Sequence, residues 1–521
     1  MATLATQRGV ETITAAQLRD YVSFIASDEL EGRDTPSRGL DTAAKFLATN
    51  LSRWGLKPAG DNGTYFQNIA LRRSLADAGQ TSVQLNGVPL NSGEDYIPLA
   101  SSGDATGELL FVGNGWLIKS KNIDAYHGMN ARGKIVVIFA PLDALPRGIS
   151  RSDLTGKPNE DWMIPSQYAK QQGAAGIIWV PNFQYLANWD RYRRRLTETG
   201  SLVVEKFQPE TVAQIPSIVV SPRIANQIFA GEQHNATTLF ERAYGDGNSS
   251  EPFALSSNKQ VSISIKGKRE QLNTQNVLAV FEGSDPVLKN EYVALGAHYD
   301  HVGVGNAVNG DAIYNGADDD ASGTTTLLAI AEALAKAKTR PKRSVLFVWH
   351  TGEEKGLWGS RYFTEYPTVP LDRIVTQINL DMIGRSKQAG DTTARNRSLS
   401  APNEIYVIGS KMMSSELGAL SEAVNREYLN LTYNYQYDDP ADPNRFFFRS
   451  DHYNYARKGI PIIFFFDGEH EDYHRPGDSA DKLDYQKMEQ VARTVYMTLW
   501  EVANLPVRPK VDKQLTDQLA R

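Results

Sequence analysis

Two stretches of the sequence decide the fold. Residues 292–300 read Tyr-Val-Ala-Leu-Gly-Ala-His-Tyr-Asp, and residues 343–354 read Arg-Ser-Val-Leu-Phe-Val-Trp-His-Thr-Gly-Glu-Glu. Each begins as an apolar run typical of a strand buried on both faces, and each ends in side chains that can bind metals. A helix predicted from about Ser322, with an apolar stripe from Leu327 to Leu334, lies between them. This order predicts parallel strands joined by a helix.

The same alternation continues along the chain. Further strands are predicted at 261–265, 276–281, 374–380, 405–408 and 461–466, and further helices at 357–366, 415–428 and 484–504. Strands that alternate with helices predict an α/β fold with a mainly parallel mixed sheet covered by helices on both faces. In such folds ligands bind beyond the carboxyl ends of the strands.

Composition excludes several classes of protein. The chain has 521 residues, more than one hydrophobic core usually serves, so several units are expected. Because it has no cysteine, any metal must be bound by His, Asp and Glu. The net charge of −6 argues against a nucleic-acid partner, and we interpret the small basic cluster Arg191–Arg195 as a solvated helix face. The longest apolar runs, such as 460–466, are too short to span a membrane.

Metal-binding side chains gather at the predicted strand ends. Six of the eight histidines lie between His298 and His474. Asp300 stands two residues after His298, on the same face of an extended chain, where it could hold one ring nitrogen. The stretch 315–323, Asn-Gly-Ala-Asp-Asp-Asp-Ala-Ser-Gly, precedes the predicted helix, and a helix cap needs one carboxylate rather than three.

Three further positions complete the pattern. Glu353 and Glu354 follow the strand 343–350 and point in different directions, so one could bind a metal while the other addresses a water molecule. Asp381 directly follows a strand, and His474 lies in a loop. Singly, each position could be a solvated strand end, an acidic turn or a surface histidine. Together they offer nitrogen and oxygen donors suited to zinc, and a shared carboxylate would hold two ions about 3.5–4 Å apart.

The sequence resembles a known family in these segments. Residues 292–301, 315–323, 351–360, 377–384 and 459–484 resemble the signature segments of the di-zinc exopeptidases, which include bacterial leucyl aminopeptidases and glutamate carboxypeptidases. Residues 24–33, Phe-Ile-Ala-Ser-Asp-Glu-Leu-Glu-Gly-Arg, and 55–60, Gly-Leu-Lys-Pro-Ala-Gly, resemble bacterial members with a protease-associated insert.

This resemblance implies a cofactor of two Zn²⁺ per chain. By motif, His298 and Asp381 would hold one ion, Glu354 and His474 the other, and Asp319 would bridge them.

The resemblance also implies the catalytic roles. Glu353 would be the general base, Asp300 would orient His298, and Tyr473 would stabilise the oxyanion. The peptide between Asp319 and Asp320 is expected to be cis.

A domain order follows. Residues 12–100 are expected to form a helical segment and lead-in that belong to the peptidase domain, 259–508 the zinc peptidase catalytic domain, and 509–521 a tail. Residues 101–258 contain the apolar runs 134–141, 173–181 and 215–220, and they resemble a protease-associated domain. A generic small α/β insert is the alternative.

The implied function is hydrolysis of N-terminal residues from peptides. A carboxypeptidase or dipeptidase of the same fold is an alternative, in which Arg445 and Arg449 could recognise a substrate carboxylate. A non-catalytic receptor-like homologue and a glutaminyl cyclase are further alternatives. The oligomeric state stays open.

The resemblance implies an exported protein, periplasmic or secreted. However, Met1–Glu11 shows no charged segment followed by an apolar stretch, so a cytoplasmic location also stays open.

Overall fold

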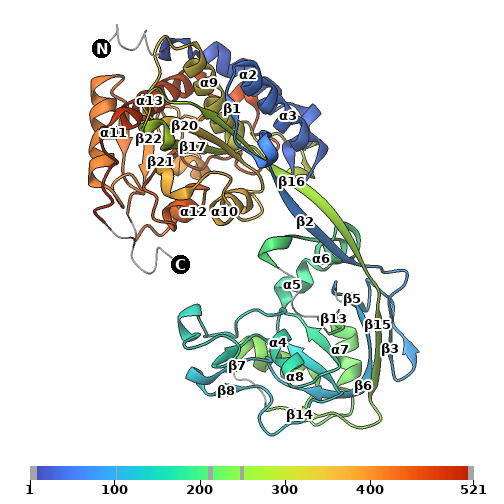
Figure 1. Ribbon diagram of the computed structural model, residues 1–521. Helices are drawn as coiled ribbons and strands as arrows, with labels where there is room; N and C mark the ends of the chain where they lie inside the picture. Colours follow the sequence, from blue (N-terminus) through green and yellow to red (C-terminus); the bar gives the residue numbers. More distant parts are fainter. Residues whose placement is uncertain are drawn as a thin grey trace. The chain divides into compact units, whose positions relative to one another are not determined.

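The computed structural model describes residues 9–515 except 101, 209–214, 247–250, 440 and 514. The chain forms two compact units (Figure 1). Unit 1 comprises the residues up to Ile69 and those from Asn273 onward, and unit 2 comprises Ala70–Leu272. The chain leaves unit 1 within β2 (Phe66–Ala76) and returns within β16 (Gly267–Phe281).

A mixed sheet forms the centre of unit 1. Its four central strands are parallel, in the order β20 (Ser344–His350), β17 (Tyr292–His298), β21 (Ile374–Leu380) and β24 (Ile462–Phe466). β16 pairs antiparallel with β20, and β22 (Glu404–Ile408) pairs antiparallel with β24. Nearly every residue of the four central strands is buried, as expected for a parallel sheet covered on both faces.

Helices cover both faces of this sheet. On one face, α2 (Ala15–Ile25), α3 (Arg38–Arg53), α9 (Gly323–Lys336), α11 (Ser415–Glu427) and α13 (Tyr485–Asn504) share a core with strand residues such as Leu295 and Phe347. On the other, α10 (Trp358–Glu365) and α12 (His452–Ala456) pack with Ala294 and Leu346. Neighbouring strand residues thus face opposite layers, and the predicted α/β class is confirmed.

The N-terminal segment is anchored to unit 1 by a buried arginine. Arg33, between α2 and α3, has no exposed surface, and its guanidinium donates hydrogen bonds to the backbone carbonyls of Ile25, Tyr299, Asn315 and Gly316. The carbonyl of Ile25 ends α2, and the other three belong to the turn after β17 and to the segment before α9. One side chain therefore fixes the two loops that carry the metal-binding motifs.

Unit 2 contains a second sheet. β6 (Gly103–Phe111), β9 (Ile135–Phe139), β11 (Gly176–Val180) and β13 (Ser217–Val220) run parallel in that order. α4 (Pro165–Gln171) lies between β9 and β11 in the chain, and α7 (Pro222–Ile228) follows β13.

The compact unit extends beyond the predicted range of 101–258. β15 (Gln260–Ile265) pairs with β6 along its full length, and β3 (Ser82–Leu85) pairs with β15. These pairings bring residues before 101 and after 258 into unit 2. Of the predicted tail 509–521, positions 514 and 516–521 lie outside the described residues.

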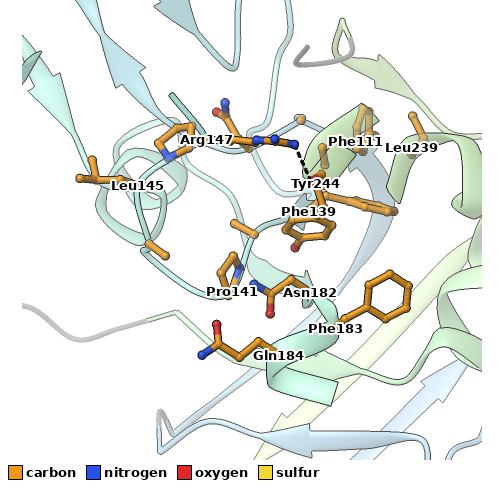
Figure 2. A pocket seen from close by; sticks show the side chains of 16 residues that line it. Phe111, Phe139, Pro141, Leu145, Arg147, Asn182, Phe183, Gln184, Leu239 and Tyr244 are labelled. Atoms are coloured by element: carbon orange, nitrogen blue, oxygen red, sulfur yellow. Dashed lines mark hydrogen bonds between the residues drawn. The ribbon is translucent and has the colours of Figure 1, made fainter. Parts of the chain in front are cut away.

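A cavity of about 400 Å³ lies beyond the carboxyl ends of β6, β9 and β11 in unit 2 (Figure 2). Its lining is mainly apolar, with Phe111, Phe139 and Tyr244, and Arg147 donates a hydrogen bond of 3.3 Å to the carbonyl of Tyr244.

The basic cluster predicted to be a solvated helix face lies on α6 (Trp189–Arg194) and on Arg195, the first residue of the π-helix that follows. Its arginines are half-buried or exposed, and Arg193 pairs with Glu198 at 2.6 Å. Among the described residues, no helix is both long and apolar enough to cross a membrane.

Candidate metal centre

The predicted ligands meet at the carboxyl edge of the unit 1 sheet. His298 is the last residue of β17, Asp381 directly follows β21, and Glu353 and Glu354 lie in the loop after β20. His474 comes from the loop after β24. Because these four strands are parallel neighbours, their ends lie along one edge and bring the side chains together.

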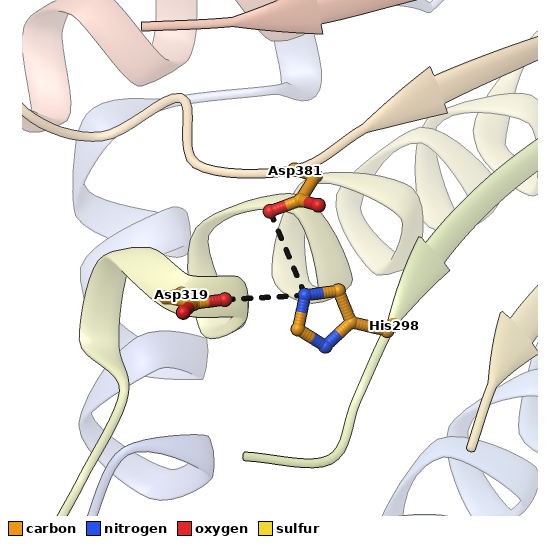
Figure 3. Close-up of side chains that lie close together, drawn as sticks. All are labelled: His298, Asp319 and Asp381. Carbon is orange, nitrogen blue, oxygen red and sulfur yellow. Dashed lines mark ion pairs between the residues drawn. The ribbon is translucent and has the colours of Figure 1, made fainter. Parts of the chain in front are cut away.

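Three of the side chains form a first donor group (Figure 3). Nε2 of His298 lies 3.2 Å from Oδ1 of Asp319 and 3.5 Å from Oδ1 of Asp381. All three residues are buried. Two carboxylates and one imidazole thus converge from β17, β21 and the segment before α9.

A second donor group lies on the other side of Asp319. Nε2 of His474 is 3.1 Å from Oδ2 of Asp319 and 3.0 Å from Oε2 of Glu354. His301 faces the same carboxylates, with Nδ1 2.9 Å from Oε1 of Glu354 and 3.6 Å from Oδ2 of Asp319. Asp319 therefore presents one oxygen to each group, the arrangement expected of a bridging carboxylate.

These distances fit tetrahedral zinc. Two ligands that each lie about 2.0–2.1 Å from such an ion are roughly 3.3 Å apart. The separations in the two groups, 2.9 to 3.6 Å, bracket that value. Within the described part of the chain, Nε2 of His298, Nε2 of His474 and Oε1 of Glu354 are buried without a hydrogen-bond partner. Buried donors and acceptors are rarely left unpaired, so the residues fit a pair of bound cations.

The three consecutive aspartates point to different partners. Asp318 accepts a hydrogen bond of 2.6 Å from the backbone N–H of Gly384. Asp320 accepts from the backbone N–H groups of Gly323 and Met382 at 2.9 and 3.2 Å. Only Asp319 faces the two donor groups. The peptide between Asp319 and Asp320 is cis, as expected.

Asp478 fixes this aspartate loop. Its carboxylate accepts hydrogen bonds from the backbone N–H of Asp318 at 3.0 Å and from that of Asp319 at 3.1 Å. Its carbonyl accepts a third from Ala317 at 3.1 Å. Asp478 follows His474 in the same loop, so one residue ties together the segments that supply the bridging carboxylate and an imidazole of the second group.

Glu353 lies next to the first donor group without belonging to it. Its Oε2 is 4.0 Å from Nε2 of His298, and its backbone N–H donates a hydrogen bond of 3.1 Å to Oδ1 of Asp300. Oδ1 of Asp300 also lies 3.7 Å from Nδ1 of His298, whereas the backbone carbonyl of Asp300 is nearer, at 3.1 Å. Asp300 therefore contacts both the His298 ring and the backbone that positions Glu353.

Burial sets the protonation of these groups. Burial raises the pKa of Glu353 well above its usual range, and the neighbouring charges of Glu354 and Asp381 add to this rise while His298 opposes it. Burial also acts to raise the pKa of Asp319, but the imidazoles of His301, His298 and His474 outweigh it and hold that pKa well below the usual range. Asp319 is thus kept as an anion, and the raised pKa of Glu353 increases the affinity of its carboxylate for the proton that a base must take up.

A small pocket adjoins the first donor group. Asp319, Glu353 and Asp381 lie on one side, and the rest of the lining is Met382, Phe446, Arg449, Ser450, Phe464, Phe466, Glu469 and Tyr473. The ring of Tyr473 stacks on that of His474, with centroids 4.0 Å apart. Arg449 pairs with Glu469 at 2.6 Å. Arg445 is not among the lining residues, and its guanidinium covers the ring of Phe448.

The structure brings all eight predicted site residues to this edge of the sheet. It adds two residues to which the sequence analysis gave no role, His301 and Asp478. His301 is the last residue of the segment 292–301 that carried the family resemblance, and it lies three residues after His298, beyond the end of the strand. Asp478 lay within a segment that carried the family resemblance.

Known proteins resemble the chain in sequence and in fold. Residues 276–499 match the sequence profile described as peptidase family M28. The aminopeptidase from Aneurinibacillus sp. strain AM-1 has a similar fold, with a TM-score of 0.51 at 16% identity over 98% of this chain and 97% of that one. The protein thus belongs to the class of mixed α/β domains in which metal-binding side chains meet at one edge of the sheet. The family profile matches the part of the chain that carries the metal donors.

Two curated relatives are similar in sequence. The Rattus norvegicus protein named aminopeptidase NAALADL1 is 33% identical over 80% of this chain and 58% of its own length. The Aspergillus oryzae protein named probable leucine aminopeptidase 2 is 35% identical over 29% of each. The matched regions therefore span less than two thirds of either relative.

Proposed function

We propose that the protein is a zinc-dependent aminopeptidase with two zinc ions per chain. The observation that carries the proposal is the pair of donor groups that share Asp319, with Glu353 beside them and outside both. His298, Asp319 and Asp381 would hold one ion, and Asp319, Glu354 and His474 the other. The names of the relatives, a leucine aminopeptidase and an aminopeptidase, support this activity.

The bound ions would polarise the scissile carbonyl and lower the pKa of the attacking water. Glu353 accepts the proton that this water loses and delivers it to the leaving amine. One carboxyl group therefore both takes up and returns the proton. Tyr473, which lines the pocket beside His474, donates a hydrogen bond to the developing oxyanion. Asp300 holds the backbone of Glu353 and the ring of His298 in their mutual positions.

The pocket favours an aminopeptidase over a carboxypeptidase. A carboxypeptidase needs a cation that is free to pair with the terminal carboxylate of the substrate. Among the described lining residues the one cation is Arg449, and its charge is already paired with Glu469. The rings of Phe446, Phe464 and Phe466 and the side chain of Met382 offer an apolar surface for the first side chain of a peptide.

Replacement of the base tests the mechanism. Glu353→Gln keeps the size of the side chain but cannot accept the proton, so kcat should fall by about 10²–10⁴-fold. Because Glu353 lies outside both donor groups, zinc content measured by mass spectrometry should stay at the wild-type level. Retained turnover would contradict the role of Glu353, and loss of zinc would show that it is a ligand.

A substrate panel tests the direction of cleavage. The wild-type enzyme should hydrolyse aminoacyl anilides with a free amine and leave amine-blocked anilides intact. Arg449→Gln should change kcat/KM for these substrates by only a few-fold. If the enzyme instead cleaved amine-blocked peptides at their free C-terminus, and Arg449→Gln abolished that cleavage, the carboxypeptidase alternative would hold.

We also propose that unit 2 is a protease-associated domain and that the protein is exported. The four parallel strands of unit 2, with α4 between two of them, support the first point, and the family resemblance supports the second. Detection of the protein in the cytoplasmic fraction of its native cells would contradict export.

A further inference from the structure

We propose that His301 is a fourth protein ligand of the second zinc ion. This inference rests on the proposed function, because it concerns the same pair of ions. It goes further by adding a ligand to which the family motifs gave no role.

His301 lies close to the carboxylates of the second donor group. His301 and His474 approach the same two carboxylates, Asp319 and Glu354, and their four nitrogen-to-oxygen separations are 2.9, 3.0, 3.1 and 3.6 Å. A tetrahedral zinc ion requires about 3.3 Å between its ligand atoms. His301 lies slightly nearer to Glu354 than His474 does, at 2.9 against 3.0 Å, and farther from Asp319, at 3.6 against 3.1 Å, so both separations lie near the value for a ligand.

The imidazole of His301 is buried without hydrogen bonds to the part of the chain that the structure describes. The His301 ring has no exposed surface, and among the described residues neither of its nitrogens has a hydrogen-bond partner. Nδ1 lies within 2.9 Å of Glu354 but lacks the alignment of a hydrogen bond. His452 also lacks partners within the described ranges but packs between aromatic rings. Nδ1 of His301 instead faces two carboxylates, where a cation between His301 and Glu354 would bind its lone pair.

The ring of His301 is held in place from several sides. The backbone N–H of His301 donates a hydrogen bond to the carbonyl of Arg33. A Cβ on Gly316 would lie 2.5 Å from Cγ of His301, so the ring occupies space that only a glycine leaves free. On a further side, the ring meets that of His474 at a centroid distance of 5.6 Å and an angle of 75°. Nδ1 is therefore fixed towards Glu354 and Asp319.

The test uses zinc binding to the full-length protein after removal of metal by a chelator. His301→Phe keeps a ring against Gly316 and removes both nitrogens. His452→Phe is the matched control, because it replaces another buried histidine of unit 1, one packed between the rings of Phe447 and Phe464. Competition with a chromophoric chelator gives the affinity of each equivalent, and X-ray absorption at the zinc edge gives the number of imidazoles bound per zinc.

We expect two zinc equivalents in the wild type and in His452→Phe. In His301→Phe, one equivalent should bind more than about 100-fold more weakly, beyond the range of about 10–100-fold caused by loss of an outer hydrogen-bond partner. The zinc edge should show three imidazoles shared by two ions in the wild type and two in His301→Phe when both sites are filled at high zinc.

Two results would overturn the inference. The first is an unchanged zinc affinity in His301→Phe. The second is a modest weakening of zinc binding with the same imidazole count in wild type and variant, because His301 would then only position Glu354. A second variant, His301→Gln, and circular dichroism guard against loss of folding as the cause. A wild-type protein that binds no zinc would instead overturn the proposed function itself, so the two failures are distinct.

Discussion

The buried His452 should make the stability of unit 1 sensitive to acid. Its ring is fully buried, stacks on Phe464 at a centroid distance of 4.3 Å, and meets Phe447 edge-on. Burial lowers the pKa of His452 from 6.5 to about 3. Below pH 6.5 the unfolded chain therefore binds a proton at this imidazole that the folded chain rejects until about pH 3. The stability present at pH 7 is lost progressively as the pH falls through that window.

The magnitude follows from the difference in pKa. At pH 4.5, two units below the unfolded value, this one group should cost about 2.7 kcal/mol of stability. Phenylalanine can keep the stacking without a titratable group. In His452→Phe, the loss of stability between pH 7.5 and 4.5 should therefore be smaller by that amount. The free energy of unfolding of both proteins can be measured by guanidinium unfolding followed by circular dichroism. A chelator is present so that bound zinc does not contribute to the stability. An identical pH dependence in the two would refute the reasoning.

Two further substitutions test the support of the metal centre. Asp478→Asn leaves one oxygen where two now accept the backbone N–H groups of Asp318 and Asp319, so zinc affinity should fall by about 10–100-fold in a chelator competition; an unchanged affinity would show that other contacts hold the loop. Gly316→Ala places a Cβ against His301 and the carbonyl of Asp319 at a residue with φ of +57°, so the variant should lose zinc and at least about 1–2 kcal/mol of stability; a folded variant with wild-type zinc content would contradict the close packing described here.

The regular elements of unit 1 could be predicted because their signals are local. β21 occupies the predicted residues, and β20 and α13 begin one residue after the predicted starts. A continuous apolar run of strand length indicates a buried strand, and an apolar stripe of helical period indicates a helix, without knowledge of the rest of the fold. The limits of unit 2 carry no such signal. They depend on the pairing of β15 with β6, which joins residues more than a hundred positions apart.

The same distinction explains the site. Strand ends at one edge of a parallel sheet must lie together, so the convergence of His298, Asp381 and Glu354 could be predicted from their positions in the chain. His301 lies beyond the end of β17, where the two-residue alternation of a strand no longer gives the direction of a side chain. Its direction depends on Arg33 and Gly316, which are distant in sequence.

The aspartate triplet shows why consecutive carboxylates can be tolerated beside a metal centre. Burial raises the pKa of Asp320 well above its usual range, with Asp381 adding to the rise, so this carboxyl favours its neutral form. Asp318 lies 3.3 Å from Nε2 of His470, which can balance its charge, and it accepts a hydrogen bond from the backbone. The repulsion expected of three adjacent anions is therefore relieved by neutralisation on one side of Asp319 and by pairing on the other. What remains is a single anion that faces both donor groups, which is the charge that a bridge between two cations requires.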